Sequence, residues 1–525
     1  MHKKLFISTA GIGSRVSGLG LIPNKSLLPI NYKATISKIL DKFDNSIEIV
    51  VALGHQANLV KSFLNLAHPE KKITFVKVDK FSGAGSGAGY TLNYCKEYLQ
   101  CPFIYSACDT ITIEKPKFEK FNWVGISKTK STERFLIFEK KTNLSGYSFF
   151  NKKRYFEISK TKQKFDAFIG LANIYDYKLF WKGFQENNQL EDNELQFSNG
   201  LYYLSNKIKL KKFKWLDTGT NESYINAINY FNDKTQRKVG EVVYITKNRV
   251  IKYFNDVNKC KKLKKRVKSL KNNAPIMIKS PNNFLVYEYV VGKHLTEASE
   301  ELFVKFLHNL NKNFLIRKNI NNFKFKKKCK IFYKDKTYER VALAINQNPD
   351  IDKISIINEK KIPSIYKILN KVNWNWLANG VPVNFHGDLQ PENIIITKNK
   401  KFKLIDWRVD FSGLQYGDVY YEFSKLNHML TINTRSVLNG KIKVYYKNKN
   451  EVKYSFETRK ILLRFQAKLY EFILNNNLDL EKVKLMTALI YLNISKFYDS
   501  PYNELLFFHG KYQLYLYTFS KKKMN

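Results

Sequence analysis

The sequence predicts a mixed α/β protein with two domains, and three observations support this fold class. The chain has 525 residues, more than one hydrophobic core usually serves, and 44% of its residues are hydrophobic. Near the N-terminus, strand-like and helix-like segments alternate as they do around a parallel sheet. Towards the C-terminus, a β-hairpin is followed by long helical patterns, which indicates a second domain of α+β type.

The first elements of the chain combine strands with glycine-rich turns. A strand is expected over residues 5–9, a helix over 34–43, and buried strands over 47–53 and 103–107. The first strand runs into Gly11-Ile12-Gly13-Ser14-Arg15, and a second glycine-rich segment, 83–89, contains Ser86 and Gly87. Glycine allows backbone N–H groups to approach a phosphate closely. Lys25 follows the first turn closely enough along the chain to reach the same phosphates.

Two aspartates stand where a metal-assisted reaction needs carboxylates. Asp109 follows the strand over 103–107, and Asp217 stands in the segment WLDTGT, 215–220. Carboxylates from two distant segments can share a magnesium ion, which bridges the α-phosphate of a nucleotide and an incoming phosphate.

Together these segments resemble the signature of sugar-phosphate and phosphocholine nucleotidyltransferases, G-x-G-[ST]-R followed by P-K-[SAP]-[LM]. Asn24, between Pro23 and Lys25, departs from that signature. The resemblance implies a Rossmann-like, GT-A-like domain in which Arg15 and Lys25 are catalytic and Asp109 and Asp217 bind the metal. It also implies nucleotide binding by Gly11, Gly13, Ser14, Ser86 and Gly87. Residues 168–173 resemble the strand that lines the acceptor pocket, and the candidate substrate contacts are Gly170, Asn173 and Glu194.

The late hairpin carries a second set of polar residues. Two short β-like runs, 394–396 and 402–405, flank a Lys/Asn turn, with Asp388 and Asn393 before the first run and Asp406 after the second. Phosphoryl transfer needs an aspartate that positions and deprotonates the attacking hydroxyl, and an Asn and a second Asp that hold magnesium. We therefore expect Asp388 to be the base and Asn393 and Asp406 to be metal ligands.

This stretch resembles the catalytic loop of the aminoglycoside phosphotransferase and choline kinase superfamily, H-x-D-x-x-x-x-N followed by I-D-[FW]. His386 and Trp407 complete the pattern here, and the resemblance implies that His386 braces the loop. Residues 417–426, GDVYYEFSKL, resemble the G-D-x-x-x-D-[LF] element of the family, with Asp418 as a bracing residue and Glu422 where the family commonly has Asp.

The resemblance also implies a two-lobed, protein-kinase-like α+β domain. A hairpin over 242–245 and 249–254 would carry the nucleotide-binding Lys252, although any Lys-rich strand offers such a residue and G-x-G-x-x-G is missing. A strand over 284–290 would form the hinge, where Glu288 and Val290 meet adenine. Helical patterns over 297–315 and 457–519 would belong to the large lobe. The expected domains are 1–230, a linker at 231–240, and 241–525 with a small lobe, 241–292, and a large lobe, 293–525.

Composition and charge limit the other classes of function. The formal charge of +45 comes mostly from lysines spread along the chain, as in proteins from AT-rich genomes, so we expect no specific nucleic-acid partner. No signal peptide or membrane-spanning run is expected, and five scattered cysteines fit a reducing cytoplasm. The expected partners are nucleotides and a small-molecule acceptor. The oligomeric state stays open.

The combined motifs predict a bifunctional transferase of phosphorus-containing groups that depends on Mg²⁺. A kinase would phosphorylate an alcohol with ATP, and a nucleotidyltransferase would then couple the product to CTP or another NTP. The resemblance favours choline, phosphocholine and CDP-choline, for use by a surface-glycan transferase in polysaccharide or lipopolysaccharide decoration. The alternative is a sugar kinase joined to a sugar-1-phosphate nucleotidyltransferase. An aromatic cage would suit choline, whereas Arg408 beside Trp407 suggests a polar or anionic acceptor, and the sequence leaves both open.

Overall fold

A computed structural model describes residues 2–129, 135–140, 147–150, 165–190, 193–235 and 237–519. The chain forms two compact units. The N-terminal unit runs to Cys260 and also contains Met277–Tyr289, and the C-terminal unit contains Lys261–Ile276 and the chain from Val290 onward. Within the described part of the chain, no helix has both the length and the apolar character needed to span a bilayer.

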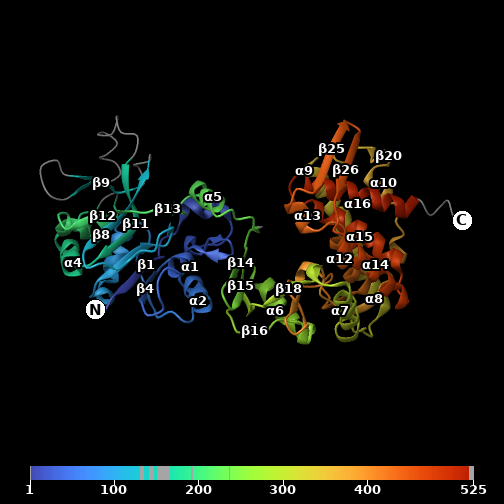
Figure 1. Cartoon of the computed structure of the whole chain (residues 1–525), viewed down its shortest axis with the longest axis horizontal. Coiled ribbons are helices and arrows are strands. Elements are labelled where there is room, and N and C mark those ends of the chain that lie inside the picture. The colour runs from blue at the N-terminus through green and yellow to red at the C-terminus, as the bar shows by residue number, and fades with distance from the viewer. Residues whose placement is uncertain are drawn as a thin grey trace. The chain divides into compact units, whose positions relative to one another are not determined.

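The N-terminal unit is built on a nine-stranded sheet that follows the predicted alternation (Figure 1). Four parallel strands lie in the order β5-β4-β1-β6, and β11 continues the sheet antiparallel to β6. The strands are β1 (Lys4–Ser8), β4 (Glu48–Leu53), β5 (Ile73–Lys77), β6 (Phe103–Ala107), β8 (Asn122–Thr129), β9 (Ile137–Lys140), β10 (Tyr147–Phe150), β11 (Phe165–Ile174) and β12 (Ile208–Lys212). The predicted mixed α/β class is confirmed for this unit.

Side chains on successive positions of β1 enter two different hydrophobic cores. Leu5 and Ile7 pack into one core, and Phe6 packs into the other. This alternation follows from the pleat of a strand that is buried on both faces. The covering helices are α1 (Thr35–Leu40), α2 (Ala57–Ala67), α3 (Ala88–Tyr94), α4 (Tyr177–Glu186) and α5 (Asn221–Tyr230), and short strands β2 (Pro29–Ile30), β3 (Lys33–Ala34), β7 (Thr110–Thr112) and β13 (Trp215–Asp217) complete the unit.

A second, four-stranded sheet completes the core of the N-terminal unit. It has the order β14-β15-β17-β16, from β14 (Glu241–Ile245), β15 (Arg249–Phe254), β16 (Met277–Ile278) and β17 (Phe284–Glu288). Alternate residues of three of its strands join the core that contains Leu5: Val242, Tyr244, Ile251, Tyr253, Phe284 and Val286. The Tyr244 hydroxyl donates to the Leu27 carbonyl at 2.5 Å. The sequence suggested that these strands belong to a kinase small lobe. In the structure, their apolar face packs into the same hydrophobic core as Leu5 of β1.

The C-terminal unit is mainly helical. The predicted hairpin is present as β22 (Ile394–Thr397) and β23 (Phe402–Leu404), and β18 (Gly292–His294) pairs with β22. Helix α12 packs against α14 and α15, and α15 packs against α16 (Figure 1). The helices are α7 (Glu300–Asn313), α8 (Asn322–Lys330), α9 (Lys336–Gln347), α10 (Ile365–Leu369), α11 (Trp374–Leu377), α12 (Val419–Thr431), α13 (Thr434–Leu438), α14 (Lys460–Asn475), α15 (Leu480–Ser495) and α16 (Tyr502–Phe519), with α6 (Val257–Leu270) entering the unit from Lys261.

Short strands and one π-helical turn complete the C-terminal unit. A π-helix, Ile331–Asp335, joins α8 to α9 without a break. The strands are β19 (Ile356–Ile357), β20 (Lys360–Lys361), β21 (Pro382–Asn384), β24 (Tyr416–Asp418), β25 (Ile442–Asn448) and β26 (Glu451–Phe456). Strand β21 leads into the loop before β22, and β24 leads into α12, so this antiparallel pair places two of the predicted motifs side by side.

Candidate active sites

The first site lies after β6, where Lys25 contacts Asp109. The Lys25 Nζ atom lies 2.7 Å from Asp109 Oδ2, and both side chains are partly exposed. Burial alone would lower the pKa of Lys25, but the negative charge of Asp109 outweighs burial and raises it. Burial alone would raise the pKa of Asp109, but Lys25 outweighs burial and lowers it. The pair is therefore ionised, and it brings two predicted site residues together from segments 84 residues apart.

Asn24, the departure from the family signature, fixes the turn that carries Lys25. Its side chain is fully buried. The Asn24 Oδ1 atom accepts from the backbone and the hydroxyl of Ser26, at 3.0 and 2.7 Å. Its Nδ2 atom donates to the carbonyls of Thr9, at 3.2 Å, and His55, at 2.9 Å. The extra residue thus caps a short helix and joins it to the segments that follow β1 and β4, and Lys25 reaches Asp109.

We expect Asn24→Ala to destabilise the N-terminal unit by about 2–3 kcal/mol, because a helix cap is lost and buried carbonyls lose their donor. It should also lower nucleotidyl transfer, because Lys25 loses its support. The free energy of unfolding in urea measures the first effect. Asn58→Ala, on the exposed face of α2, is the matched control and should change stability little. Equal stabilities of the two variants would contradict this role of Asn24.

Asp217 lies beside Asp109 across a short antiparallel pair. Asp217, on β13, is opposite Thr110 of β7, the residue after Asp109. Thr218 donates its backbone N–H and its hydroxyl to the Asp109 carbonyl, at 3.0 and 3.2 Å. The backbones of Asp109 and Asp217 are therefore neighbours, and Asp217 Oδ1 accepts from Gly219 N–H at 2.8 Å. Mg²⁺ prefers oxygen ligands and is usually held by one or two carboxylates together with substrate phosphates, and this donor set fits it. The described residues contain no group of three or more His, Cys, Asp or Glu side chains that could hold a metal ion.

The glycine-rich segment 83–89 packs against the segment that contains Glu194. The Gly85 N–H donates to the Asn193 carbonyl at 2.6 Å, and the Ser86 carbonyl accepts from Leu195 N–H at 2.9 Å. A Cβ on Gly87, whose φ is +118°, would lie 2.9 Å from the Glu194 Cβ. Glycine is needed at this position because a side chain would displace the neighbouring segment. Glu194, Ser86 and Gly87 are therefore neighbours.

The residues of the first turn lie on the Lys25 side of the site. A Cβ on Gly13, whose φ is +69°, would lie 3.3 Å from the Lys25 Cβ, whereas one on Gly11 would meet nothing within 4 Å. Ser14 and Arg15 begin the short helix Ser14–Leu19. The positive charge of Arg15 contributes to the lowered pKa of Asp109, after the larger effect of Lys25. These contacts place the turn beside the ion pair.

Strand β11 brings one of its two predicted residues to this site. Gly170 has a φ of +75°, and a Cβ there would lie 2.8 Å from the Ala107 Cβ and 3.1 Å from the Thr110 hydroxyl. Asn173 instead lies opposite Ile104, early in β6. It is buried, and its Nδ2 atom donates to the carbonyls of Glu119 and Phe121, at 3.2 and 2.7 Å. Asn173 therefore supports a loop and lies away from Asp109.

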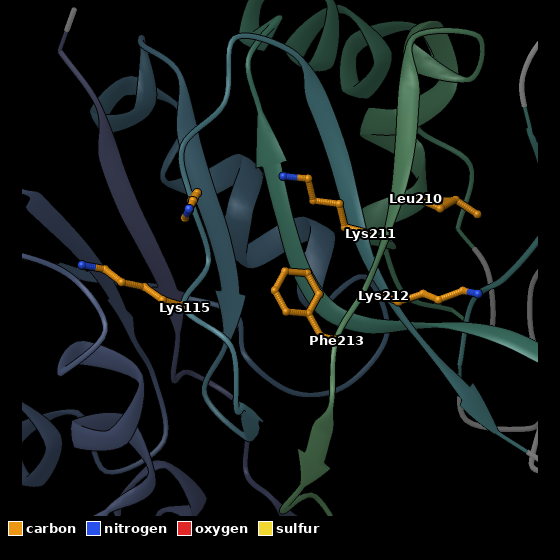
Figure 2. A pocket seen from close by; sticks show the side chains of 6 residues that line it. Lys115, Leu210, Lys211, Lys212 and Phe213 are labelled. Atoms are coloured by element: carbon orange, nitrogen blue, oxygen red, sulfur yellow. The ribbon is translucent and has the colours of Figure 1, made fainter.

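A surface hollow of about 500 Å³ lies elsewhere in the N-terminal unit (Figure 2). Its lining consists of four lysines and two apolar residues: Lys115, Lys117, Lys211, Lys212, Leu210 and Phe213. No motif residue lines it. Lys211 is already paired with Glu119 at 2.9 Å. The hollow is therefore separate from the candidate site at Asp109.

The second site is the loop between β21 and β22 in the C-terminal unit. The His386 Nε2 atom lies 2.9 Å from the Ile405 carbonyl, and its Nδ1 atom accepts from Asp388 N–H at 3.3 Å. These partners assign the proton to Nε2. The Asn393 Nδ2 atom donates to Asp388 Oδ2 at 3.1 Å and to the Asp388 carbonyl at 2.9 Å. His386 thus braces the loop and joins it to the end of β23.

Asp406 lies at the same end of the hairpin as Asn393. The Ile405 N–H donates to the Asn393 carbonyl at 2.9 Å, and Arg408 N–H donates to the His386 carbonyl at 2.9 Å. Asp406 itself has a φ of +62°, a conformation that Asp tolerates better than most residues. The Asn393 amide nitrogen is used by Asp388, which leaves its oxygen as the atom of the type that Mg²⁺ binds. Asn393 and Asp406 therefore fit a magnesium site.

The sequence interpretation did not identify the cation that pairs with Asp388. Lys425 Nζ lies 2.8 Å from Asp388 Oδ1, and the Lys425 side chain is only 8% exposed. Burial alone would raise the pKa of Asp388, but the ion pair with Lys425 outweighs burial and lowers it to about 2. Lys425 lies within the segment that resembles G-D-x-x-x-D-[LF], and a lysine among the apolar residues of a helix that is buried throughout was the signal available.

Two further residues support the loop and were also not assigned this role. Glu422 is fully buried, and its carboxylate accepts from the N–H groups of His386 and Gly387, at 3.2 and 2.7 Å. Arg266 of α6, also fully buried, donates to the carbonyls of Phe385 and Gln415. Both side chains act on backbone atoms that are distant in the sequence. Glu422 stands in the segment that resembles G-D-x-x-x-D-[LF], but no local pattern marks this role of Glu422, and none marks Arg266.

We expect His386 to make the C-terminal unit sensitive to acid. Burial lowers the pKa of His386 to about 4, whereas an unfolded His titrates near about 6.5. Between these values the unfolded chain binds more protons, so the free energy of unfolding falls as the pH drops from 6.5 to 4. His386→Gln should remove about 2 kcal/mol of the loss between pH 7 and pH 5.

Urea unfolding of wild type and His386→Gln at pH 7 and pH 5 measures this effect. Buried His428 and His509, whose pKa values burial also lowers, are present in both proteins and cancel in the comparison. An equal loss of stability in the two proteins would show that His386 is not responsible.

Asp418 and Trp407 are buried and form hydrogen bonds with other protein groups. Asp418 is fully buried, and its carboxylate accepts from the Tyr333 hydroxyl at 2.7 Å and from Val381 N–H at 2.9 Å. Burial raises the pKa of Asp418 to about 6. Trp407 is 5% exposed, and its Nε1 donates to the Leu263 carbonyl at 3.0 Å. Four aromatic residues of this unit that could have contributed to a cage for choline are buried: Trp374, Trp407, Tyr420 and Tyr421.

The proposed nucleotide contacts of the kinase small lobe lie on the second sheet or just after it. Lys252 lies opposite Leu285 of β17, on the face of the sheet that points away from the shared core, and its Nζ is 5.6 Å from the centre of the Tyr287 ring. Glu288 ends β17, and Val290 follows it. Nucleotide binding by Lys252, Glu288 and Val290 stays a prediction.

No family model matches the chain, and no curated protein matches it. Among solved structures, a UDP-glucose pyrophosphorylase complexed with UDP-glucose is 17% identical with a TM-score of 0.36, and the match covers 44% of this chain and 99% of that chain. The CTP:phosphocholine cytidylyltransferase from Streptococcus pneumoniae is 14% identical with a TM-score of 0.34, covering 44% and 99%. A UTP-bound UGPase from Acinetobacter baumannii is 10% identical with a TM-score of 0.34, covering 44% and 93%. At these identities and TM-scores the likenesses carry no argument about activity.

Proposed function

We propose that the chain is a bifunctional enzyme that phosphorylates a small alcohol and then couples the product to a nucleotide. One observation carries this proposal: each unit contains its own carboxylate paired with a lysine, Asp109 with Lys25 and Asp388 with Lys425. Each pair lies beside further oxygen ligands, Asp217 in one unit and Asn393 with Asp406 in the other. A protein that only bound nucleotide or nucleic acid would need neither set.

In the kinase step, Asp388 orients the acceptor hydroxyl and takes its proton as the oxygen attacks the γ-phosphorus of ATP. ADP leaves as the bond to the γ-phosphorus breaks. Lys425 keeps Asp388 ionised before the reaction, and His386, Glu422 and Arg266 hold the loop in place. Asn393 and Asp406 would hold magnesium, which when bound would neutralise part of the negative charge of the phosphates.

In the nucleotidyl step, the new phosphate attacks the α-phosphorus of an NTP and pyrophosphate leaves. Lys25 is placed to bind phosphate oxygens and to balance the charge that develops there. Asp109 and Asp217 would hold magnesium, and the glycine-rich segment 83–89 would allow a close approach of the nucleotide. The leading substrate pair from the motif resemblance is choline with CTP, and the second is a sugar with a nucleotide that forms an NDP-sugar.

Phosphate-resolved product analysis of the full chain tests the proposal. Wild type is supplied with Mg²⁺, ATP, each of the four NTPs, and choline, ethanolamine, glycerol or a hexose. We expect one acceptor to become a monophosphate and then an NDP conjugate, with release of pyrophosphate. Absence of both ATP-dependent phosphorylation and pyrophosphate release, with phosphorylated acceptors also supplied, would overturn the proposal.

A further inference from the structure

A cluster of cations borders the loop that carries Asp388. We call Lys336, Arg340 and Arg408 the cation cluster. Lys336 begins α9, and its Nζ lies 3.9 Å from the centre of the Phe332 ring. The Arg408 guanidinium carbon lies 5.4 Å from the centre of the same ring. Two positive groups from distant segments therefore gather at one aromatic side chain.

The cation cluster adjoins the catalytic loop directly. Arg408 Cδ lies 2.8 Å from the position that a Cβ on Gly387 would occupy, and Gly387 precedes Asp388. Lys336 Nζ also lies 5.4 Å from the centre of the Tyr421 ring, one helical turn before Lys425 on α12. Lys425 in turn is paired with Asp388 at 2.8 Å. The cluster thus lies close to the loop that carries Asp388.

Protein carboxylates oppose the positive charge of the cluster only from a distance: Asp388 acts on Lys336, and Glu339 acts on Arg340. Among the residues that the structure describes, none of Lys336, Arg340 and Arg408 forms an ion pair, and Asp388 is already used by Lys425 and Asn393. Arg340 donates to the Asn493 carbonyl at 3.3 Å. Burial, followed by the charges of Arg408 and Arg340, lowers the pKa of Lys336. Like charges held together at a partly buried site favour binding of an anion.

A π-helical turn lies directly before Lys336. The π-helix Ile331–Asp335 lies between α8 and α9, and its residue Phe332 is buried. Single π-helical turns are rare and occur frequently at functional sites. Lys336 is the first residue after this turn, so the turn sets the direction in which its side chain leaves the helix.

We propose that the acceptor of the kinase step carries an anionic group, a carboxylate or a phosphate, which Lys336 and Arg408 bind beside Asp388. This inference rests on the proposed kinase function and names the substrate class for it, and it replaces choline, which the motif resemblance alone favours, as the leading acceptor. A quaternary ammonium acceptor would meet like charge at this position, whereas an anionic acceptor offsets the charge of both cations and leaves its hydroxyl near Asp388.

Matched acceptors that differ only in their anionic group test the inference. The pairs are glucose with glucose 6-phosphate, glucose with glucuronate, glycerol with glycerol 3-phosphate and glycerol with glycerate, and choline is a further arm. The phosphate and carboxylate arms distinguish the two sources of the anion. We expect kcat/KM for the preferred anionic member to exceed that for its neutral partner by about 100-fold, since two charged hydrogen-bond donors recognise the anion.

Variants of one lysine separate acceptor binding from nucleotide binding. Lys336→Gln should raise KM for the anionic acceptor by about 10-fold or more while KM for ATP is unchanged, and Lys336→Arg should restore most of the affinity. Lys334→Gln is the matched control. Lys334 lies in the π-helix that precedes Lys336, but its Nζ is near another ring, 5.9 Å from the centre of Tyr338. Preference for choline or a neutral member, or a rise in KM for ATP in Lys336→Gln, would overturn the inference.

Calorimetry keeps the inference separable from the kinase proposal. If no acceptor is phosphorylated, binding of the same pairs to the full chain with Mg²⁺ and a non-hydrolysable ATP analogue is measured. Tighter binding of an anionic member than of its neutral partner, lost in Lys336→Gln, would support the anion site while the kinase proposal fails. Absence of that difference in wild type would overturn the anion site itself.

Discussion

Asp388→Asn is expected to lower kcat for acceptor phosphorylation by about 10²–10⁴-fold, the usual contribution of a positioned general base. The amide keeps the shape of the side chain but cannot take the proton of the acceptor hydroxyl. Nucleotidyl transfer from a supplied phosphorylated acceptor should be unchanged, because Asp109, Asp217 and Lys25 all belong to the other unit. Measuring ADP release and pyrophosphate release separately distinguishes the two steps.

A matched control guards against a general effect of losing a carboxylate in this region. Asp410→Asn changes the next aspartate after Asp406, which accepts from Gly413 N–H at 2.9 Å, and it should leave kcat unchanged. Thermal unfolding of both variants shows whether the loss of the Lys425 partner has disturbed the fold. A kcat for Asp388→Asn within a few-fold of wild type, in a folded protein, would remove Asp388 from the role of base.

Asp109→Asn is expected to lower nucleotidyl transfer by about 10²–10³-fold, because a charge that stabilises the reacting phosphates through a metal is removed. The change also removes the ionic partner of Lys25, which lies 2.7 Å away. Pyrophosphate release with a supplied phosphorylated acceptor measures the effect. Phosphorylation of the acceptor by ATP should not change.

A double-mutant comparison shows whether Asp109 and Lys25 act together. Lys25→Met alone and the double variant are measured beside Asp109→Asn, and the combined loss should be clearly smaller than the product of the two single losses. Asp44→Asn serves as the control, because the Asp44 side chain is 78% exposed. If Asp109→Asn retains the wild-type rate, this carboxylate is not part of the nucleotidyltransferase site.

The sequence predicted those features that depend on local patterns. The strand over 103–107 and the hairpin over 394–405 were recognisable because short apolar runs end at polar residues and turn formers. Lys25 and Asp109 were recognisable as separate motif residues, but their contact depends on how Asn24 is capped and buried, which the motif does not encode. The position of Lys25 within the signature therefore did not predict its contact with Asp109.

Long-range partners could not be predicted from one sequence. Lys425, Glu422 and Arg266 act on the loop that carries Asp388 from segments that are distant along the chain. The alternation of β14 and β15 showed that one face of their sheet is apolar, but it did not show which surface this face covers. Period-two patterns identify the buried face of a strand and carry no information about its packing partner.

The position of that second sheet has a consequence for protein synthesis. The core of the N-terminal unit includes residues as far along the chain as Phe284 and Val286. A nascent chain that has emerged only to residue 240 lacks the strands that cover Leu27 and Phe63, so those apolar side chains stay exposed to solvent and to chaperones. The unit can close its core only after the strand Phe284–Glu288 has left the ribosome, when more than half of the 525 residues have been translated.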